Sequence, residues 1–454
     1  MLRSEGGQRI EKRPGYTFSM IFSDVSTSGC NFSVTTTLTM NASKQLFNRT
    51  SPCHIKKALS YQMAKIAVTP LPSRNPEPVD APTHWVNNPP TSFKNPWPSF
   101  AKQHGLVDVF KTRFSTNRNF VPVPETRDEL VKVRKPDWGR GLDGWQHELK
   151  ATWLGHAGFL VETACSASTT GLEVSADDDS KSNRGIRILF DAVFSERTSP
   201  VGWLGPKRYT PTPCTLDELP EVDLVIISHN HYDHLDIATI SHVYKKSKAA
   251  GRGIHFFAAL GNKQWFLNAG IGITADEVTE CDWWDSQEID VQGVGSINLT
   301  CTPTQHFSGR TPFDAGQTLW SSWVVEDVQS NKKLYFSGDT AYKATSAKTA
   351  CPAFKQIGEV FGGFDLAMVP IGLYSPEWFM SNVHCCPEDS LEIHKDIRSK
   401  KTIGMHYGTV RGGLSAQYED VREPPRRWQE CCAKEGKWQR ECWLCDVGET
   451  VTAA

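Results

Sequence analysis

The 454-residue sequence lacks a long apolar run: no stretch reaches the roughly 18 uninterrupted apolar residues that a membrane-spanning helix requires. It also lacks an excess of charge, because the formal net charge is −2, and this gives no electrostatic reason to expect nucleic acid as a partner. Its 13 cysteines are odd in number and scattered, which favours free thiols in a reducing, intracellular compartment over a disulfide framework. These absences indicate a protein that is soluble or peripheral to a membrane.

Acidic side chains are missing from residues 25–76, which are rich in Ser and Thr and carry Lys and Arg. This composition is typical of a mitochondrial transit peptide. Four apolar residues in the segment fall at helical spacing and predict a basic amphipathic helix: Ile55, Leu59, Met63 and Ile66. Residues 1–24 do contain acidic side chains, so mitochondrial targeting and an untargeted disordered tail both stay open. A proline-rich linker is expected at residues 70–90.

A dense group of metal-ligand side chains follows the apolar residues 222–227, in the run Ser228-His-Asn-His-Tyr-Asp-His234. Alternate side chains of a strand share a face, so the first two histidines can hold one ion, while a turn brings the following Asp and His to a second. A surface loop that happens to be rich in His is the alternative, but a buried strand should not end in uncompensated polar groups. The predicted ligands from this run are His229, His231, Asp233 and His234.

Three later strand-like runs end in further ligands: Thr302-Pro-Thr-Gln-His306, Tyr335-Phe-Ser-Gly-Asp339-Thr340 and Thr402-Ile-Gly-Met-His406. Imidazole and carboxylate suit Zn²⁺, and paired ions that work together lie about 3.5–4 Å apart. We therefore predict two Zn²⁺, with one shared position for a water whose proton is released near neutral pH. The first ion is assigned to His229, His231 and His306, the second to Asp233, His234 and His406, and Asp339 bridges both.

The order HxHxDH, lone His, Gly-Asp-Thr and last His resembles the metallo-β-lactamase superfamily of αββα hydrolases. Flanking motifs between about Ser92 and Thr450 narrow the resemblance to the N-acyl-phosphatidylethanolamine-hydrolysing phospholipase D family. These motifs are Phe93-Lys-Asn-Pro-Trp-Pro98, Trp153-Leu-Gly-His-Ala157, Gly205-Pro-Lys-Arg208, Pro213-Cys-Thr-Leu-Asp-Glu-Leu-Pro220, Asp282-Trp-Trp284, Cys351-Pro-Ala-Phe354, Pro370-Ile-Gly372 and Trp378-Phe-Met380. The resemblance implies zinc-dependent hydrolysis of a membrane phospholipid, giving N-acylethanolamine and phosphatidate, with peripheral membrane contact.

The same ion pair would also serve a lactone or thioester hydrolase, and this alternative stays open. An inactive zinc scaffold is a further alternative, and the oligomeric state is also open.

Asp233, Asp339 and His384 are the catalytic candidates. The resemblance aligns His384 with a histidine that contacts the substrate phosphate, although Val383 stands where the family has Gln. Further substrate contacts are predicted at Tyr232, Trp378 and Phe379, and an apolar approach could also involve Met380, Tyr374 and Trp203, although aromatic clusters are more often core. Lys207 and Arg208 either hold an anionic head group or pair with acids.

We expect an α+β fold, an αββα sandwich with an irregular N-terminal arm. Residues 1–90 are assigned to a disordered or targeting tail and linker, 91–148 to the arm, and 149–450 to the catalytic domain. Paired strands are predicted at 151–156 and 159–161, helices at 236–246, 351–361, 387–400 and 424–435, and the last strand at 441–446. A zinc site made of Cys431, Cys432, Cys442 and Cys445 is the alternative for that last segment.

Four smaller features complete the predictions. Residues 166–185 are expected to form an extended loop, and residues 341–350 are an insertion relative to the family pattern, of unknown effect on the site. His156 is interpreted as a packing residue beside the metal ligands. His394 is interpreted as facing solvent on a helix.

Overall fold

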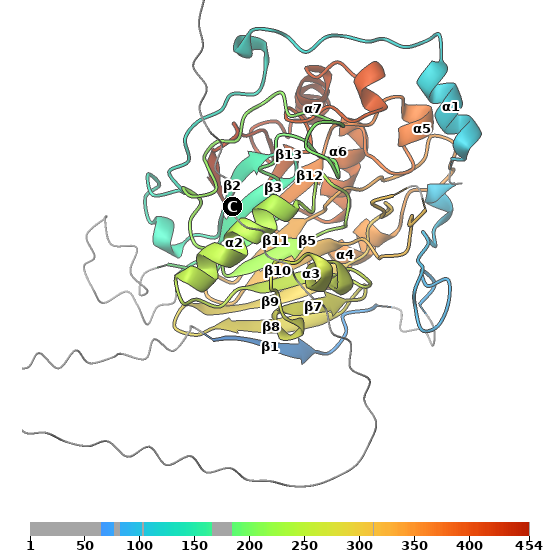
Figure 1. Cartoon of the computed structure of the whole chain (residues 1–454). Coiled ribbons are helices and arrows are strands. Elements are labelled where there is room, and N and C mark those ends of the chain that lie inside the picture. The colour runs from blue at the N-terminus through green and yellow to red at the C-terminus, as the bar shows by residue number, and fades with distance from the viewer. Residues whose placement is uncertain (1–64, 77–81, 102–103, 166–183, 312, 454) are drawn as a thin grey trace, which may run out of the picture. The chain divides into compact units, whose positions relative to one another are not determined.

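The structure is a computed structural model that describes residues 65–76, 82–101, 104–165, 184–311 and 313–453. These residues belong to one compact unit, Ser60–Ala454. Two β-sheets lie face to face between layers of helices (Figure 1). The predicted tail and amphipathic helix up to residue 64, and most of the loop at 166–185, lie outside the described residues. No helix in the described part of the chain is both long and apolar enough to cross a bilayer.

The first sheet has seven strands, three joined antiparallel at one side and four parallel at the other. Its central parallel strands are buried along their whole length, as expected where both faces of a sheet are covered. In spatial order the strands are β15 (Thr450–Thr452), β2 (Lys150–Gly155), β3 (Gly158–Glu162), β4 (Arg187–Phe190), β5 (Leu224–Ile227), β6 (His255–Ala259) and β7 (Val278–Cys281).

The second sheet has eight strands. The five strands from β1 to β11 in the order below pair antiparallel, and the pairs from β11 onward are parallel. In spatial order the strands are β1 (Ile66–Leu71), β8 (Ser286–Val291), β9 (Gly295–Thr302), β10 (Ser322–Asp327), β11 (Lys332–Phe336), β12 (Leu366–Pro370), β13 (Thr402–Met405) and β14 (Cys442–Trp443).

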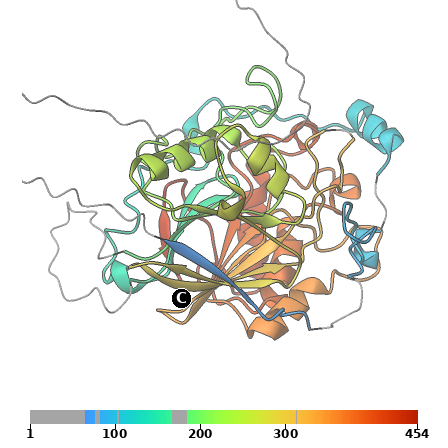
Figure 2. The ribbon, with the colours of Figure 1, turned by 60° about the horizontal axis from the view of Figure 1, so that its bottom comes forward.

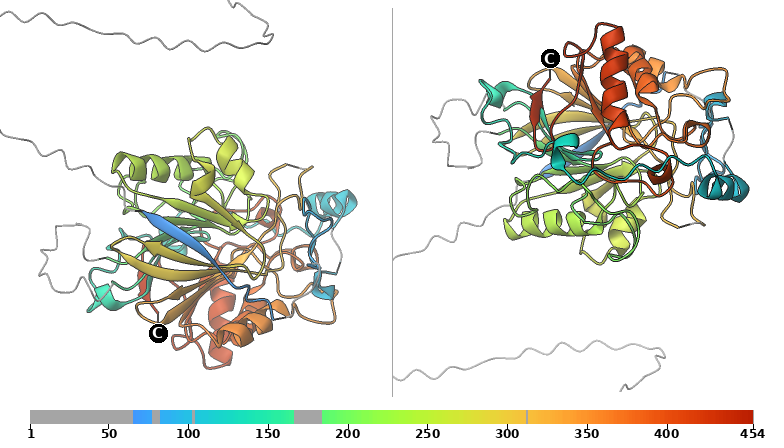
Figure 3. Two further views of the ribbon diagram at one scale, coloured as in Figure 1. Left: turned by 90° about the horizontal axis from the view of Figure 1, so that it is seen from below. Right: turned by 90° about the horizontal axis from the view of Figure 1, so that it is seen from above.

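Helices cover the outer faces of both sheets, so the predicted αββα sandwich is confirmed (Figures 2 and 3). Side chains of α2 (Ile237–Ala249) and α3 (Lys263–Asn268) pack against the seven-stranded sheet. On the other side lie α4 (Ala353–Phe361), α6 (Pro387–Asp396) and α7 (Glu423–Lys434). The helices α1 (Leu106–Phe114) and α5 (Glu377–Met380) lie together at one edge of the molecule. Short 3₁₀ turns occur at Pro98–Phe100, Arg127–Glu129, Trp145–His147, Ala275–Glu277 and Ser415–Gln417.

Alternation along each strand decides which layer a side chain joins. In β3, Phe159 and Val161 point to the core between the sheets, whereas Leu160 belongs to the layer beneath α2. The core between the sheets contains large aromatic side chains that are fully buried, among them Trp153 and Trp323. This apolar layer holds the two sheets in fixed relation, and with them the loops at the strand ends.

The structure corrects the prediction for residues 66–90. Residues 66–71 form the edge strand β1, antiparallel to β8, where a disordered tail and linker were expected. Edge strands tolerate proline, which explains why Pro70 pairs with Gln287 without ending the strand. Farther along, His84 is buried and lies 2.6 Å from a carboxylate oxygen of Asp282. The described part of the predicted linker is therefore packed onto the catalytic domain.

Two predictions near the C-terminus were also wrong. The strand expected at 441–446 shrinks to β14, and the last strand is β15, which returns to the other sheet. In the same segment, the thiols of Cys431, Cys432, Cys442 and Cys445 are free and buried.

The second wrong prediction concerns His394, which is buried rather than exposed: its Nδ1 lies 2.8 Å from the hydroxyl of Thr402, and its Nε2 lies 3.1 Å from Glu441. The four predicted helices are present, as α2, α4, α6 and α7.

A buried ion triad joins three neighbouring strands of the seven-stranded sheet. Glu162 in β3 accepts hydrogen bonds from Lys150 in β2, at 3.1 Å, and from Arg187 in β4, at 2.7 Å. All three side chains are buried. Burial raises the pKa of Glu162, but the charges of Arg187 and Lys150 outweigh it and hold this pKa below its ordinary value of 4.5.

Substituting Glu162→Gln should lower the free energy of unfolding by about 3–5 kcal/mol at pH 7, because two cations lose their counter-charge in a buried site. The folded-state pKa of Glu162 is depressed, so its stabilisation is fully present above pH 4.5 and is lost as the pH falls through the folded-state value. The difference between wild type and E162Q in urea titrations should therefore shrink below pH 4.5. A difference that is small at pH 7, or constant down to pH 3, would contradict the assignment.

Candidate metal centre

Loops at the ends of four strands carry the seven predicted ligands to one edge of the sandwich. The HxHxDH run follows β5 in one sheet, while the other three ligands follow β9, β11 and β13 in the second sheet. The loop after β5 ends where Asp236 caps α2, accepting hydrogen bonds from the backbone N–H groups of Ala238 and Thr239. Because the two sheets are locked together by their shared core, groups from distant parts of the sequence meet here.

The three histidines predicted for the first ion lie together. Nε2 of His229 is 2.8 Å from Nδ1 of His231, and Nε2 of His306 is 3.4 Å from the same Nδ1. The ligand atoms of the three residues all lie within 4.8 Å of one another. The remaining nitrogen of His306 donates to the carbonyl oxygen of Val383, at 2.7 Å, which fixes the ring so that Nε2 faces its neighbours.

The ligands predicted for the second ion also lie together, with Asp339 between the two groups. Asp233, His234 and His406 form a cluster whose ligand atoms are within 4.8 Å of one another, and His156 belongs to the same cluster. The carboxylate oxygens of Asp339 lie 3.2 Å from Nε2 of His234 and 3.0 Å from Nε2 of His406. On the other side they lie 3.8 Å from Nε2 of His306. Asp339 thus reaches both groups.

The donor atoms of this cluster fit divalent cations. Several buried atoms make no well-aligned hydrogen bond among the described residues, although Asp339 lies close to two of these rings, and they are Nε2 of His234, both ring nitrogens of His406, Nδ1 of His384 and Oδ1 of Asp339. A buried polar atom left without a partner costs free energy, so a group of them pointing at one another needs a shared partner. Imidazole nitrogen and carboxylate oxygen are donors that zinc and similar ions accept.

Burial keeps most of the imidazoles neutral, which is the form that binds a metal. It lowers the pKa of His229 and His306 well below the ordinary value, and that of His231 and His384 to about 4. Burial raises the pKa of the Asp339 carboxyl, but the charges of His234 and His406 outweigh it, so that this pKa lies well below its ordinary value. His234 differs: burial lowers its pKa, but the charges of Asp339 and Asp233 outweigh it and raise this pKa well above the ordinary value. The cluster therefore combines four neutral rings with a charged imidazole beside an ionised carboxylate.

Asp191 supports the centre and was missed in the sequence. It directly follows β4, is completely buried, and lies 2.8 Å from Nδ1 of His234 and 2.8 Å from the backbone N–H of Ser228. The oxygen that faces His234 also accepts a hydrogen bond from the Ser228 hydroxyl, which in turn lies 2.9 Å from Nδ1 of His229. One carboxylate thus orients two predicted ligands. The sequence feature that could have indicated this role is the position of Asp191 directly after an apolar strand.

Gly338 lets the two ligand loops approach each other. Its φ of +56° falls in the left-handed region, and a Cβ atom there would lie 2.5 Å from the Cβ of Ser228. The backbone carbonyl of Ser228 also accepts a hydrogen bond from the N–H of Ser321, at 2.9 Å. The glycine of the Gly-Asp-Thr motif is therefore required by packing between the sheets, directly beside Asp339.

The HxHxDH loop is held from outside by Arg310. Its guanidinium donates to the carbonyls of Asn230 (2.7 Å) and Leu235 (3.0 Å), and its central carbon lies 3.8 Å from the ring centre of Tyr232. Tyr232, predicted to contact substrate, thus stacks on an arginine. His156, predicted to pack beside the ligands, lies 3.0 Å from a carboxylate oxygen of Asp233.

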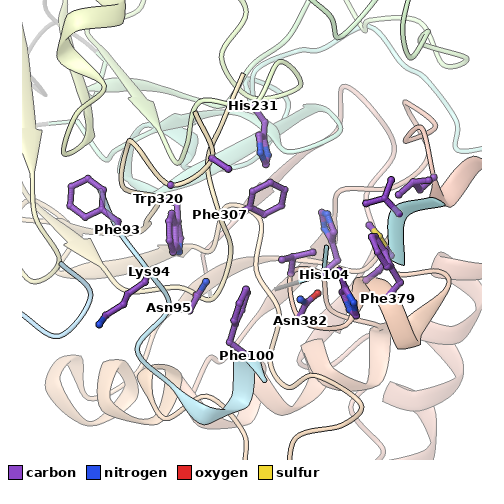
Figure 4. A pocket seen from close by; sticks show the side chains of 17 residues that line it. Phe93, Lys94, Asn95, Phe100, His104, His231, Phe307, Trp320, Phe379 and Asn382 are labelled. Atoms are coloured by element: carbon purple, nitrogen blue, oxygen red, sulfur yellow. The ribbon is translucent and has the colours of Figure 1, made fainter. Parts of the chain in front are cut away.

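An apolar pocket of about 460 Å³ opens beside the cluster. Figure 4 shows aromatic side chains around it, with His231 at the top of the view. Of the predicted substrate contacts, Phe379 and His384 line this pocket, whereas Trp378 is half exposed outside it. Its lining also includes Phe93, Phe100, His104, Val109, Phe307, Trp320, Met380 and Leu414. These come from the N-terminal arm as well as from the catalytic domain.

A second, polar cavity of about 250 Å³ touches the other side of His384. Two of its lining residues, Lys343 and Thr345, belong to the inserted segment 341–350, and Tyr374 lies here rather than in the apolar pocket. The insertion is fixed to the site, since the N–H of Thr345 donates to the hydroxyl of Ser381 at 2.9 Å. It forms a wall of this cavity and does not line the apolar pocket.

The remaining predicted contacts do not line the apolar pocket. Lys207 pairs with Glu196 at 2.7 Å on the surface. Arg208 is largely buried and donates to the carbonyl of Val193, so it has a structural partner. Trp203 is 77% exposed. The contacts of Lys207 and Arg208 therefore do not support the hypothesis that these residues hold an anionic head group.

Comparison with known proteins shows the family of this chain. Residues 186–407 match the family model described as a beta-lactamase superfamily domain. The chain is 34% identical over 369 residues to a Caenorhabditis elegans protein named N-acyl-phosphatidylethanolamine-hydrolyzing phospholipase D 1, covering 80% of this chain and 92% of that one. It is 30% identical over 380 residues to a Saccharomyces cerevisiae protein named N-acyl-phosphatidylethanolamine-hydrolyzing phospholipase D, mitochondrial, covering 79% and 75%.

The identity and coverage of these relatives, together with the ligand loops at the strand ends, agree with the resemblance found in the sequence motifs. This chain belongs to the N-acyl-phosphatidylethanolamine-hydrolysing phospholipase D family, within the metallo-β-lactamase superfamily of hydrolases.

Proposed function

We propose that this chain is a zinc-dependent phosphodiesterase that hydrolyses N-acylphosphatidylethanolamine to N-acylethanolamine and phosphatidate. The observation that carries the proposal is the junction of the ligand cluster with the apolar pocket, because His231 and His384 belong to both. A phosphodiester at the cluster would have an apolar space beside it for an acyl chain. The names of the Caenorhabditis and Saccharomyces relatives support the same substrate.

Two Zn²⁺ would be held by the seven predicted ligands, with Asp339 shared between them. When bound, the ions supply positive charge for the nonbridging oxygens of a phosphate and acidify a water nucleophile. Asp191 and Ser228 orient His234 and His229, and Arg310 fixes the loop between them. The protein's contribution is a rigid set of donors that needs no rearrangement when the substrate arrives.

His384 is the proposed contact to the substrate phosphate. It is buried between the apolar pocket and the polar cavity, with Nδ1 3.9 Å from a carboxylate oxygen of Asp339. This nitrogen has no hydrogen-bond partner among the described residues, so it is available to a ligand. The aromatic walls of the pocket, including Phe379, exclude water from the reacting bond and pack against an acyl chain.

The proposed substrate is a membrane lipid, so the protein would act as a peripheral membrane protein inside the cell. A mitochondrial location is supported by the absence of acidic residues from positions 25–76 and by the name of the Saccharomyces relative.

The zinc-loaded protein should release N-acylethanolamine and phosphatidate from N-acylphosphatidylethanolamine in detergent micelles, and mass spectrometry would identify both products. A lactone and a thioester serve as comparison substrates, because the same ion pair could open either. Faster turnover of the lactone or thioester, with no N-acylethanolamine released, would reject the lipid substrate and leave the fold and family unaffected.

Substituting Asp339→Asn should reduce kcat by about 10²-fold or more while zinc is retained, because six other ligands remain and the lost group is the shared negative charge. Zinc content by elemental analysis, measured alongside turnover, separates these effects. Asp290→Asn, an exposed change of the same kind on β8, is the matched control and should behave as wild type. Full activity of D339N would refute the bridging role.

Substituting Asp191→Asn should weaken zinc binding about 10- to 100-fold, because the carboxylate that fixes the ring of His234 is lost. Competition with a chelator of known affinity measures this effect directly, without a substrate. If D191N binds zinc as tightly as the wild type, Asp191 does not position the ligand.

A further inference from the structure

Helix α1 presents an apolar surface to solvent. Val107, Phe110 and Phe114 recur at helical spacing and are 67%, 64% and 63% exposed, and the two phenylalanine rings pack on each other with centres 4.5 Å apart. The opposite side of the helix faces the protein: Thr112 is fully buried, and its carbonyl accepts a hydrogen bond from the hydroxyl of Tyr418. The exposed stripe, formed by Val107, Phe110 and Phe114, is called the α1 surface below.

Exposed cationic side chains lie on helix α1 and directly after it, close to the α1 surface in sequence. Lys111, Arg113 and Arg118 are exposed on the helix and just after it. Asp108, the one acid of α1, lies 3.4 Å from a ring nitrogen of His104. Aromatic residues flanked by exposed cations are typical of helices that lie in the interface of an anionic lipid layer, with the rings among the acyl chains and the charges at the phosphates.

The α1 surface lies beside the apolar pocket. Val109 of the same helix, which is 38% exposed, lines the pocket together with Leu414. His104, just before the helix, stacks on Phe379 with ring centres 4.5 Å apart, and its ring also meets that of Trp378, which is 49% exposed. Figure 4 shows His104 and Phe379 side by side at one end of the pocket. A chain entering the pocket at this end would pass α1.

From these observations we infer that the α1 surface docks the protein on an anionic lipid bilayer, at the end of the pocket through which a lipid enters. This inference rests on the proposed function, since it assigns α1 to delivery of a membrane substrate. A subunit contact fits less well: three side chains on a nine-residue helix fall far short of the roughly 800 Å² per partner that a stable dimer buries. The net positive charge also favours phosphates over an identical basic surface.

The test compares wild type with F110S/F114S, both zinc-loaded, on vesicles of phosphatidylcholine containing phosphatidylglycerol and N-acylphosphatidylethanolamine. Neither side chain lines the pocket, and both are mostly exposed, so the variant should fold normally, which thermal unfolding checks. Binding measured by flotation should fall about 10-fold or more, with an equal loss of turnover on vesicles. Turnover of a short-chain, water-soluble analogue should not change.

Two further variants are compared with the wild type in the same assay. Val328→Ser removes a 53% exposed apolar side chain at the turn between β10 and β11, at the opposite ends of these strands from the metal cluster, and should bind vesicles as wild type. K111A/R113A should lose about 5-fold per charge on phosphatidylglycerol vesicles, and little on pure phosphatidylcholine.

The inference is overturned if wild type does not float with vesicles, if F110S/F114S floats as wild type does, or if it loses turnover of the soluble analogue equally. It is also overturned if the wild type is a dimer that F110S/F114S converts to a monomer, since α1 would then be a subunit contact. Failure of the proposed function looks different: vesicle binding would still depend on α1, while no N-acylethanolamine would appear with any form of substrate.

Discussion

A buried carboxylate surrounded by imidazoles is the constraint on which this end of the molecule depends. Asp339 is 3% exposed and lies within 4 Å of His234, His306 and His406. Its charge, removed from water, needs a close counter-charge. Burial lowers the pKa of His234, but the charges of Asp339 and Asp233 outweigh it and hold this pKa well above its ordinary value, so His234 supplies part of that counter-charge. Cations bound at the centre would satisfy the carboxylate and imidazole donors at once. Both the chemistry of the site and the stability of the local fold therefore favour bound cations.

The rigidity of the centre follows from how the two sheets meet. The loop after β5 belongs to one sheet and the Gly-Asp-Thr loop to the other, and they touch where Gly338 has no side chain to keep Ser228 away. Asp191 then connects Ser228 to His234 within the first sheet. At the second sheet, the carbonyl of Val383 orients His306. Ligands from both sheets are thus held by buried hydrogen bonds, as a preorganised site requires.

Much of this could be predicted from the sequence, because strand ends and ligand types are local signals. The seven predicted ligands are brought together, and the helices after them are present near their expected bounds. Asp191 was missed because one acid after a strand looks like any polar strand end until the fold places it against His234. His394 was misjudged because its partner Glu441 is 47 residues away. The strand β1 was missed because proline argues against a strand unless the strand is known to lie at an edge.

That edge strand sets a limit on trimming of the N-terminus. A cut ahead of Ile66 leaves β8 covered, whereas a cut inside β1 would bare a row of peptide groups on β8 and invite pairing with other chains. A maturation protease that acted on this protein would therefore have to cut ahead of residue 66, because a cut beyond it would favour self-association of the processed protein.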